Sequence, residues 1–237
     1  VYTSADSVFQ IAAHEERFGL ERLYEVCRVT RGLVDELNVG RVIARPFVGT
    51  NADDFTRTPR RRDYSMRPPE PNLLTHLEEK GLPFYAIGKI EDIYAKVAVT
   101  KAVHTVSNRD GMAKVMEAVK EQNKGLIFAN LVDFDMLYGH RRNPAGYAKC
   151  LEEFDELLGP LLLSLGRNDY LFISADHGLD PTYKGTDHTR ERVPLLLYSP
   201  SVEPKDLGTR ETYADLGATV AEILELPPLA FGRSVLS

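Results

Sequence analysis

Carboxylate and imidazole side chains gather in two segments of the sequence, each at the end of an apolar run. In the first segment Asp135 is followed by His140; in the second, Asp176 and His177 are adjacent and His188 follows eleven residues later. Aspartate and histidine are common protein ligands of divalent metals. A lone Asp-His pair is more often a surface turn or helix cap, but three of the six histidines fall in these segments. The pattern therefore favours a metal site.

The mixture of ligand types narrows the choice of ion. Aspartate with histidine suits Mn²⁺ or Zn²⁺ better than Ca²⁺, which prefers oxygen ligands alone, and the absence of cysteine ligands argues against a structural zinc. Five protein ligands exceed what one catalytic ion usually takes while it keeps an open position. Two ions about 4 Å apart, holding a phosphoryl group between them, fit the count better. The nearby Asp133 is expected to orient the site or to end the strand rather than to ligate.

Short apolar runs alternate with helical patterns in the second part of the chain. Continuous apolar strands between helices predict an α/β core with a mostly parallel sheet covered on both faces. Ligand sites in such sheets lie beyond the carboxyl ends of the strands, so the two metal-binding segments share a crevice if their strands are close. The predicted strands are residues 84–87, 126–131, 170–174 and 193–198, and the predicted helices are residues 73–80, 111–122, 144–165 and 212–224.

The first part of the chain predicts a smaller α+β unit. Residues 20–37 have apolar positions at helical spacing, and residues 7–15 fit a short helix. Residues 41–47 are strand-like, and Pro46 indicates a sheet edge or the end of a strand. Residues 51–71 are rich in arginine and proline, which indicates an irregular, basic connection with a hinge. We therefore assign residues 1–67 to a cap domain and residues 68–237 to the core that carries the metal site.

Composition and charge restrict the function classes. The chain of 237 residues is 43% hydrophobic and 27% charged, as ordinary globular proteins are. Its net charge of -6 argues against general affinity for nucleic acids or for a membrane surface, and no apolar run approaches a membrane span. Cys27 and Cys150 are too few for a disulfide framework and are expected to be buried thiols in a reducing cytoplasm. An anionic substrate remains compatible with a locally basic or metal-loaded site.

The motifs around the candidate ligands resemble those of a known superfamily. The metal motifs of the alkaline phosphatase superfamily are similar to residues 130–135, 139–141, 175–178 and 185–191. The chain also resembles the phosphopentomutase family nearly from end to end, most specifically in residues 2–16, 40–47, 61–65 and 88–90. The resemblance implies an alkaline-phosphatase-like core, which agrees with the α/β interpretation above, together with a smaller α+β cap.

The resemblance implies roles for individual residues. One manganese ion would be held by Asp135, His140 and His188, and a second by Asp176 and His177 with help from residues outside this chain. Cationic groups suit a second phosphate that lies away from the metals, although each could instead be a solvated surface residue. The residues implied to bind the pentose phosphate, five from the cap and one from the core, are Ser4, Asp6, Arg41, Ile43, Arg57 and Lys89.

The implied reaction is that of an isomerase, the interconversion of ribose 1-phosphate and ribose 5-phosphate and of the corresponding deoxyribose phosphates. A phosphothreonine would give a phosphoryl group to the sugar, form a bisphosphorylated intermediate, and take the group back from the other end. A sugar bisphosphate would act as primer. Phosphoryl transfer needs dense positive charge around the equatorial oxygens, which two divalent ions supply.

The sequence departs from the family at its beginning. The family's chain normally opens with a core segment that carries an aspartate ligand and then the threonine that is phosphorylated, and neither motif is found here. We therefore expect no catalytic nucleophile within this chain, one nearly complete metal site and one incomplete site. The chain alone is expected not to turn over substrate.

Two alternative functions stay open. The chain could be a non-catalytic fragment that binds metal or sugar phosphate. It could also come from a related metal-dependent phosphoglycerate mutase or phosphatase, although the cap motifs argue against this. The sequence does not decide the resident metal, the preference between ribose and deoxyribose, or the oligomeric state.

Overall fold

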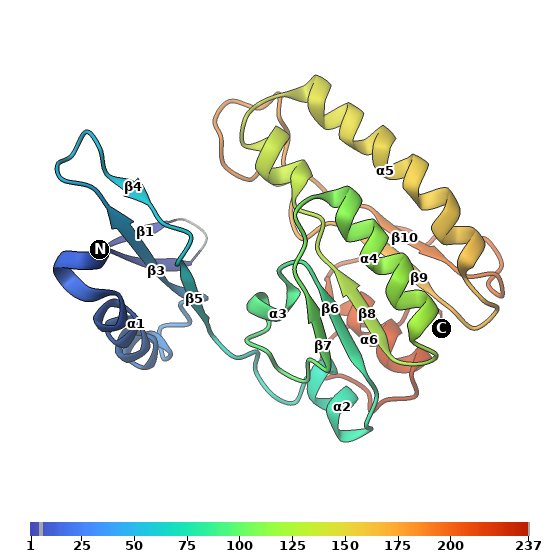
Figure 1. The fold of residues 1–237 in the computed structure, drawn as a ribbon. Helices are drawn as coiled ribbons and strands as arrows, with labels where there is room; N and C mark the ends of the chain where they lie inside the picture. The colour runs from blue at the N-terminus through green and yellow to red at the C-terminus, as the bar shows by residue number, and fades with distance from the viewer. Residues whose placement is uncertain (5–6, 237) are drawn as a thin grey trace. The chain divides into compact units, whose positions relative to one another are not determined.

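The computed structural model describes residues 1–4 and 7–236, and the chain divides into two compact units. Unit 1 comprises Val1–Glu70 and Glu91–Val97, and unit 2 comprises Pro71–Ile90 and Ala98–Ser237. Figure 1 labels the elements of both units. The first break in the chain therefore lies near the boundary expected after residue 67, and a short segment further along belongs to unit 1.

Unit 1 is built on a five-stranded sheet. A π-helical turn, η1 (Glu15–Gly19), leads from the second strand into helix α1 (Leu20–Val34). β2 and β3 pair in parallel, β1 adds antiparallel to β2, and both β4 and β5 add antiparallel to the other side of β3. The strands are β1 (Tyr2–Ser4), β2 (Val8–His14), β3 (Arg41–Val48), β4 (Thr56–Arg57) and β5 (Arg62–Ser65).

Helix α1 packs against one face of this sheet. Its Leu23, Tyr24 and Cys27 share a buried cluster with Ile11 of β2 and with Val42 and Ala44 of β3. Because side chains alternate between the two faces of a strand, the odd-numbered residues of β3 project from the opposite face. These residues are Arg41, Ile43, Arg45 and Phe47.

The prediction of a short helix over residues 7–15 is wrong, because residues 8–14 form β2. The whole of β2 pairs with β3, which satisfies its backbone groups, and Val8 and Ile11 are both buried in the sheet. These long-range contacts outweigh the local pattern. The segment over residues 51–71 is also more regular than expected, since it contains β4 and β5.

Pro46 lies in the central strand β3 rather than at a sheet edge. β5 pairs with β3 only up to Ala44, and β4 begins its pairing at Phe47, so the ladder on that side is interrupted at Pro46. The carbonyl of Pro46 still accepts a hydrogen bond from the Thr58 N–H at 3.0 Å. The gap removes the need for the N–H that proline lacks.

Unit 2 contains a three-stranded parallel sheet in the order β7-β6-β8. All four residues of the central strand β6 are buried, as expected for a strand covered on both faces. The predicted α/β class with parallel strands is therefore confirmed. The strands are β6 (Phe84–Ile87), β7 (Lys101–Val103) and β8 (Leu126–Ala129). The helices are α2 (Leu73–Glu79), α4 (Asn108–Glu121), α5 (Pro144–Ser164) and α6 (Ala214–Ile223). The short helix α3 (Ile90–Ile93) begins at the last residue of the first segment of unit 2.

The last two strands, β9 (Leu171–Ser174) and β10 (Leu195–Tyr198), form a separate antiparallel pair. In the described residues, β9 is therefore not hydrogen-bonded to β8, the other strand that leads into a metal-binding segment. A parallel connection needs a crossover, usually a helix, and residues 175–194 form none. The chain instead returns on itself after a long loop, and this loop carries three of the candidate metal ligands.

Two expectations about the chain as a whole can be compared with the structure. Cys27 and Cys150 are both buried free thiols, and burial raises the pKa of Cys27 to about 11. Both cysteines therefore pack as small apolar residues. Among the helices in the part of the chain that the structure describes, none is both long and apolar enough to cross a bilayer.

Candidate metal centre

A π-helical turn, η2 (Phe134–Gly139), positions the first two candidate ligands. The backbone N–H of His140 donates to the carbonyl of Asp135 at 3.1 Å, which is the i→i+5 bond of a π-turn. This spacing brings the two side chains together, with His140 Nε2 3.0 Å from Asp135 Oδ1. Single π-turns are rare and occur often at functional sites.

The third candidate ligand, His188, comes from the loop between β9 and β10. An isolated bridge between Gly178 and Thr189 closes this loop, with the Thr189 N–H donating to the Gly178 carbonyl at 3.0 Å. The Asp180 N–H donates to Thr189 Oγ1 at 2.8 Å and strengthens the closure. His188 Nε2 then lies 3.4 Å from Asp135 Oδ1.

The absence of two side chains allows these segments to approach. A Cβ on Gly139 would overlap Leu179 Cδ2 of the loop, so glycine lets the loop lie directly on η2. A Cβ on Gly178 would lie 2.8 Å from the carbonyl oxygen of Thr189, closer than real Cβ contacts. Both glycines therefore allow the close approach of the segments that carry the candidate ligands.

The three side chains form one cluster whose ligand atoms lie within 4.8 Å of one another. Asp135 Oδ1 is buried and has no hydrogen-bond partner, although two imidazole nitrogens face it. A buried acceptor without a donor is costly, and a cation among these atoms would remove that cost. The side chains of Asp135, His140 and His188 are 36%, 38% and 37% exposed, so an ion can reach them.

The orientation of His140 also fits a metal ligand. Its Nδ1 lies at hydrogen-bond distance from the backbone carbonyl of Thr186, and because a carbonyl only accepts, Nδ1 carries the proton. In the neutral ring, Nε2 then has a free lone pair that points toward Asp135. Metal-bound histidines are commonly held by such a bond at the other ring nitrogen. Thr186 had no signal in the sequence, because its role depends only on its main chain.

Asp176 and His177 lie beside this cluster. The ring of His177 stacks on that of His188, with centroids 3.5 Å apart and planes at 15°. His177 Nδ1 is 3.1 Å from the Gly178 carbonyl, and its Nε2 is 3.6 Å from Asp176 Oδ1. Within residues 1–4 and 7–236, these two side chains do not join a second group of three metal-binding side chains.

Asp133 has a different use. Its buried Oδ2 accepts the Asn108 N–H at 2.7 Å, and the Asp133 N–H donates to Asn108 Oδ1 at 3.0 Å. Asn108 is the first residue of α4, where a carboxylate is favoured by the helix dipole. This reciprocal pair ties α4 to the segment that leads into η2, which agrees with the orienting role expected for Asp133.

The candidate substrate residues of unit 1 that the structure describes lie on three strands, β1, β3 and β4. Arg41 of β3 is 3.6 Å from Asp63 of β5, and Arg57 of β4 donates to the hydroxyl of Tyr2 at 3.4 Å. Ile43 is only 2% exposed, so its side chain serves the packing of the sheet. Ser4 ends β1, where it pairs with Val8, and Asp6 lies outside the described residues.

Lys89, the candidate from unit 2, is exposed and follows the central strand β6. The preceding Gly88 has φ +80°, and a Cβ there would lie 2.6 Å from the Asn130 carbonyl. The turn at Gly88 thus approaches the end of β8 closely, at the carboxyl edge of the parallel sheet. This edge is where ligands of α/β sheets are bound.

Known proteins resemble this chain over nearly all of its length. Proteins named phosphopentomutase from Symbiobacterium thermophilum, Caldanaerobacter subterraneus and Clostridioides difficile are 58%, 55% and 53% identical to it over 236, 238 and 236 residues. The matches cover 99%, 100% and 99% of this chain. In each case the chain spans 60% of the length of the relative.

A family model agrees with the geometry of the centre. The model, described as the metalloenzyme superfamily, matches residues 83–228, which is more than half of the chain and includes Asp135, His140 and His188. The matched range also contains the parallel sheet of unit 2 and the loop between β9 and β10. The chain therefore belongs to the metalloenzyme superfamily.

Proposed function

We propose that this chain provides the metal-binding and sugar-phosphate-binding parts of a phosphopentomutase. The observation that carries the proposal is the 58% identity over 99% of the chain to the protein of that name from Symbiobacterium thermophilum. The proposed reaction interconverts ribose 1-phosphate and ribose 5-phosphate, or the deoxyribose equivalents, through a bisphosphorylated sugar. The proposed setting is the cytoplasm.

The proposed ions are two Mn²⁺. Asp135, His140 and His188 would hold one ion, and their close approach with an unpartnered buried oxygen supports this assignment. Asp176 and His177 would contribute to the other. When bound, the ions supply positive charge to the oxygens of the transferring phosphoryl group. The role of this chain is to hold its carboxylate and imidazole ligands in place before the substrate binds. The Thr186 carbonyl holds the His140 ring in this way.

The sugar phosphate would be bound by the side chains that the family resemblance indicates. Arg41, Arg57 and Lys89 supply positive charge, and guanidinium groups suit the geometry of phosphate. Ser4, Asp6 and Ile43 belong to the same proposal. The phosphothreonine and the action of a sugar bisphosphate primer are part of the proposed reaction, and we assign the nucleophile to no residue of this chain.

The proposal is tested by a coupled assay for conversion of ribose 1-phosphate to ribose 5-phosphate, with Mn²⁺ and a sugar bisphosphate present. Two samples are compared, this chain and the product of its complete reading frame. We expect turnover by the complete product and its loss in the His188→Ala variant. If the complete product binds the metal but does not convert ribose 1-phosphate, the proposal is ruled out.

A second candidate is metal and sugar-phosphate binding without catalysis, which the 60% coverage of the relatives supports. Calorimetry separates the two possibilities. Binding of Mn²⁺ and ribose 5-phosphate without turnover by any form of the protein would favour the binding function. A related phosphatase or phosphoglycerate mutase would give no turnover of ribose 1-phosphate, but would act on a phosphate monoester or on a phosphoglycerate supplied in its place.

A further inference from the structure

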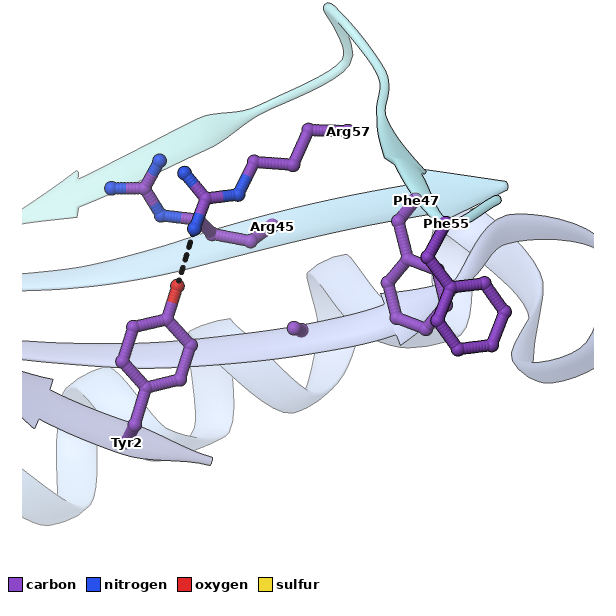
Figure 2. Close-up of a pocket in the computed structure, with 6 residues that line it drawn as sticks. Tyr2, Arg45, Phe47, Phe55 and Arg57 are labelled. Atoms are coloured by element: carbon purple, nitrogen blue, oxygen red, sulfur yellow. Dashed lines mark hydrogen bonds between the residues drawn. The ribbon is translucent and has the colours of Figure 1, made fainter. Parts of the chain in front are cut away.

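Unit 1 contains a cavity of about 250 Å³ on the sheet face that α1 does not cover (Figure 2). A water molecule occupies roughly 30 Å³ in the liquid, so the cavity has room for a small organic ligand. It is formed by side chains from β1, β2, β3 and β4 and from the segment before β4. The lining residues are Tyr2, Ala12, Arg45, Phe47, Phe55 and Arg57.

The two arginines of this cavity have only neutral hydrogen-bond partners. Arg45 Nε donates to Gln10 Oε1 at 2.6 Å, and Arg57 Nη2 donates to the Tyr2 hydroxyl at 3.4 Å, the dashed line of Figure 2. In the described part of the chain, no carboxylate forms an ion pair with either guanidinium. Asp63, an acid that acts on Arg45 electrostatically, accepts two hydrogen bonds of 2.6 Å from Arg61.

Asp63, which pairs with Arg41 and Arg61, therefore balances only part of the positive charge on this face. Burial lowers the pKa of Arg45 and the nearby Arg61 and Arg57 guanidinium groups lower it further, whereas Tyr2 and Asp63 raise it. The net lowering means that the protein stabilises the charged form of Arg45 only in part. An anion in the cavity would add opposite charge and charge-assisted hydrogen bonds to the two guanidinium groups.

The other end of the cavity is apolar. The ring centroids of Phe47 and Phe55 lie 4.8 Å apart. The His14 ring packs edge-on against both, with centroid distances of 5.5 Å to Phe47 and 6.5 Å to Phe55. Figure 2 shows these rings at one end and the two guanidinium groups at the other. The cavity thus combines an anion-binding end with an aromatic wall, which suits a small phosphate monoester with a less polar body.

We propose that Arg45 and Tyr2, together with Arg57, form a binding pocket for the phosphate of a sugar phosphate. Arg45 contacts the phosphate, and Tyr2 holds the Arg57 guanidinium in place. The inference rests on the proposed function for the identity of the ligand as a pentose phosphate. It adds Arg45 as a recognition residue and Tyr2 as a positioning residue, neither of which was among the candidate substrate residues.

The test is calorimetric titration of the metal-free chain, in a chelator at low ionic strength, so that no metal centre contributes. The ligands are ribose 5-phosphate, inorganic phosphate and uncharged ribose. We expect binding of the two phosphates and none of ribose. Arg45→Gln and Arg57→Gln should each raise the Kd about tenfold or more, the effect of a lost charge-assisted hydrogen bond. Tyr2→Phe should raise it less, because it only frees Arg57.

The matched control is Arg22→Gln, an exposed arginine on α1 that stacks over Phe18. Its Kd should equal that of the unchanged chain. Thermal unfolding of each variant shows whether it folds, and Arg57, which is exposed, tests the pocket even if Arg45→Gln does not fold. No phosphate binding by the unchanged chain, or equal binding by folded Arg45→Gln, would overturn the pocket.

This result is independent of the mutase assay. Phosphate binding that depends on Arg45 in a protein without mutase turnover would remove the proposed function and leave the pocket. Mutase turnover together with phosphate binding that is unchanged in Arg45→Gln would remove the pocket and leave the proposed function. Tighter binding of ribose 5-phosphate than of inorganic phosphate would indicate that the aromatic wall contacts the sugar.

Discussion

At the scale of single residues, Asp135 is the centre of the candidate metal site. Its Oδ1 faces Nε2 of His140 at 3.0 Å and Nε2 of His188 at 3.4 Å without a hydrogen bond to either. One carboxylate oxygen and two imidazole nitrogens, all possible metal ligands, therefore lie close together. An ion bound by all three explains why such groups are brought together from two distant segments of the chain.

The His188→Ala variant should bind Mn²⁺ more weakly, because water replaces an imidazole poorly. We expect the Kd for Mn²⁺ to rise by more than about tenfold, because mutation of a residue that only supports a metal ligand already weakens metal binding by about that factor. Calorimetry with Mn²⁺ measures the change. His104→Ala is the control, because His104 is exposed and lies in neither metal-binding segment. Equal affinities for the two variants would remove His188 from the site.

Asp215 predicts a dependence of stability on pH. Its buried carboxylate accepts the Arg233 N–H at 2.8 Å and Arg210 Nε at 2.7 Å, and these bonds lower the pKa of Asp215. A carboxyl with a lowered folded-state pKa stabilises the protein above its unfolded pKa, about 3.9, and this stabilisation disappears as the pH falls through the folded pKa.

Asp215→Asn should therefore lower the free energy of unfolding at pH 7, by roughly 1–3 kcal/mol if the lost bonds are typical of buried groups. The difference from the unchanged chain should shrink below about pH 4, where the carboxyl of the unfolded chain takes up a proton, and should be smallest below the lowered folded-state pKa. Urea unfolding at several pH values measures it, with the exposed Asp155→Asn as control. A difference that is constant with pH would contradict the proposed charge effect.

At the scale of elements, the metal centre depends on contact between the π-turn η2 and the loop before β10. Gly139 of the turn faces Leu179 of the loop with no room for a methyl group. The contact fixes the approach of His188 to Asp135, although neither Gly139 nor Leu179 carries a ligand atom. Backbone packing thus decides ligand geometry here.

Gly139→Ala should weaken Mn²⁺ binding because the new methyl group displaces the loop. Adding Leu179→Ala in the same chain should restore part of the affinity, since it removes the atoms that the methyl group meets. Gly159→Ala in α5 is the matched control, because nothing lies within 4 Å of a Cβ there. Calorimetry compares all four proteins. Unchanged affinity in Gly139→Ala would show that the loop position does not control the site.

At the scale of the whole molecule, all five candidate metal ligands belong to unit 2. Mn²⁺ binds only states in which the ligands are assembled, so it should stabilise those segments against local opening. We expect slower hydrogen exchange in residues 132–142 and 175–190 on addition of Mn²⁺, and unchanged exchange in α1, β2 and β3. The His188→Ala variant should show little of this protection. Equal protection in both units would contradict the assignment.

The sequence alone indicated the candidate metal ligands and the elements with strong local patterns. The strand of apolar residues at β6 and the helix with regular spacing at α1 were predictable, because their signals come from neighbouring residues. The types of the metal ligands were equally visible, since carboxylates and imidazoles have few rivals for such ions.

The tertiary structure decided how these parts meet. Only long-range pairing made residues 8–14 a strand, closed the loop so that His188 reaches Asp135, and set Arg45 beside Arg57. The Thr186 carbonyl and the space at Gly139 carry no signal of side-chain type. Such features follow from contacts between residues far apart in the chain, and local propensity does not contain them.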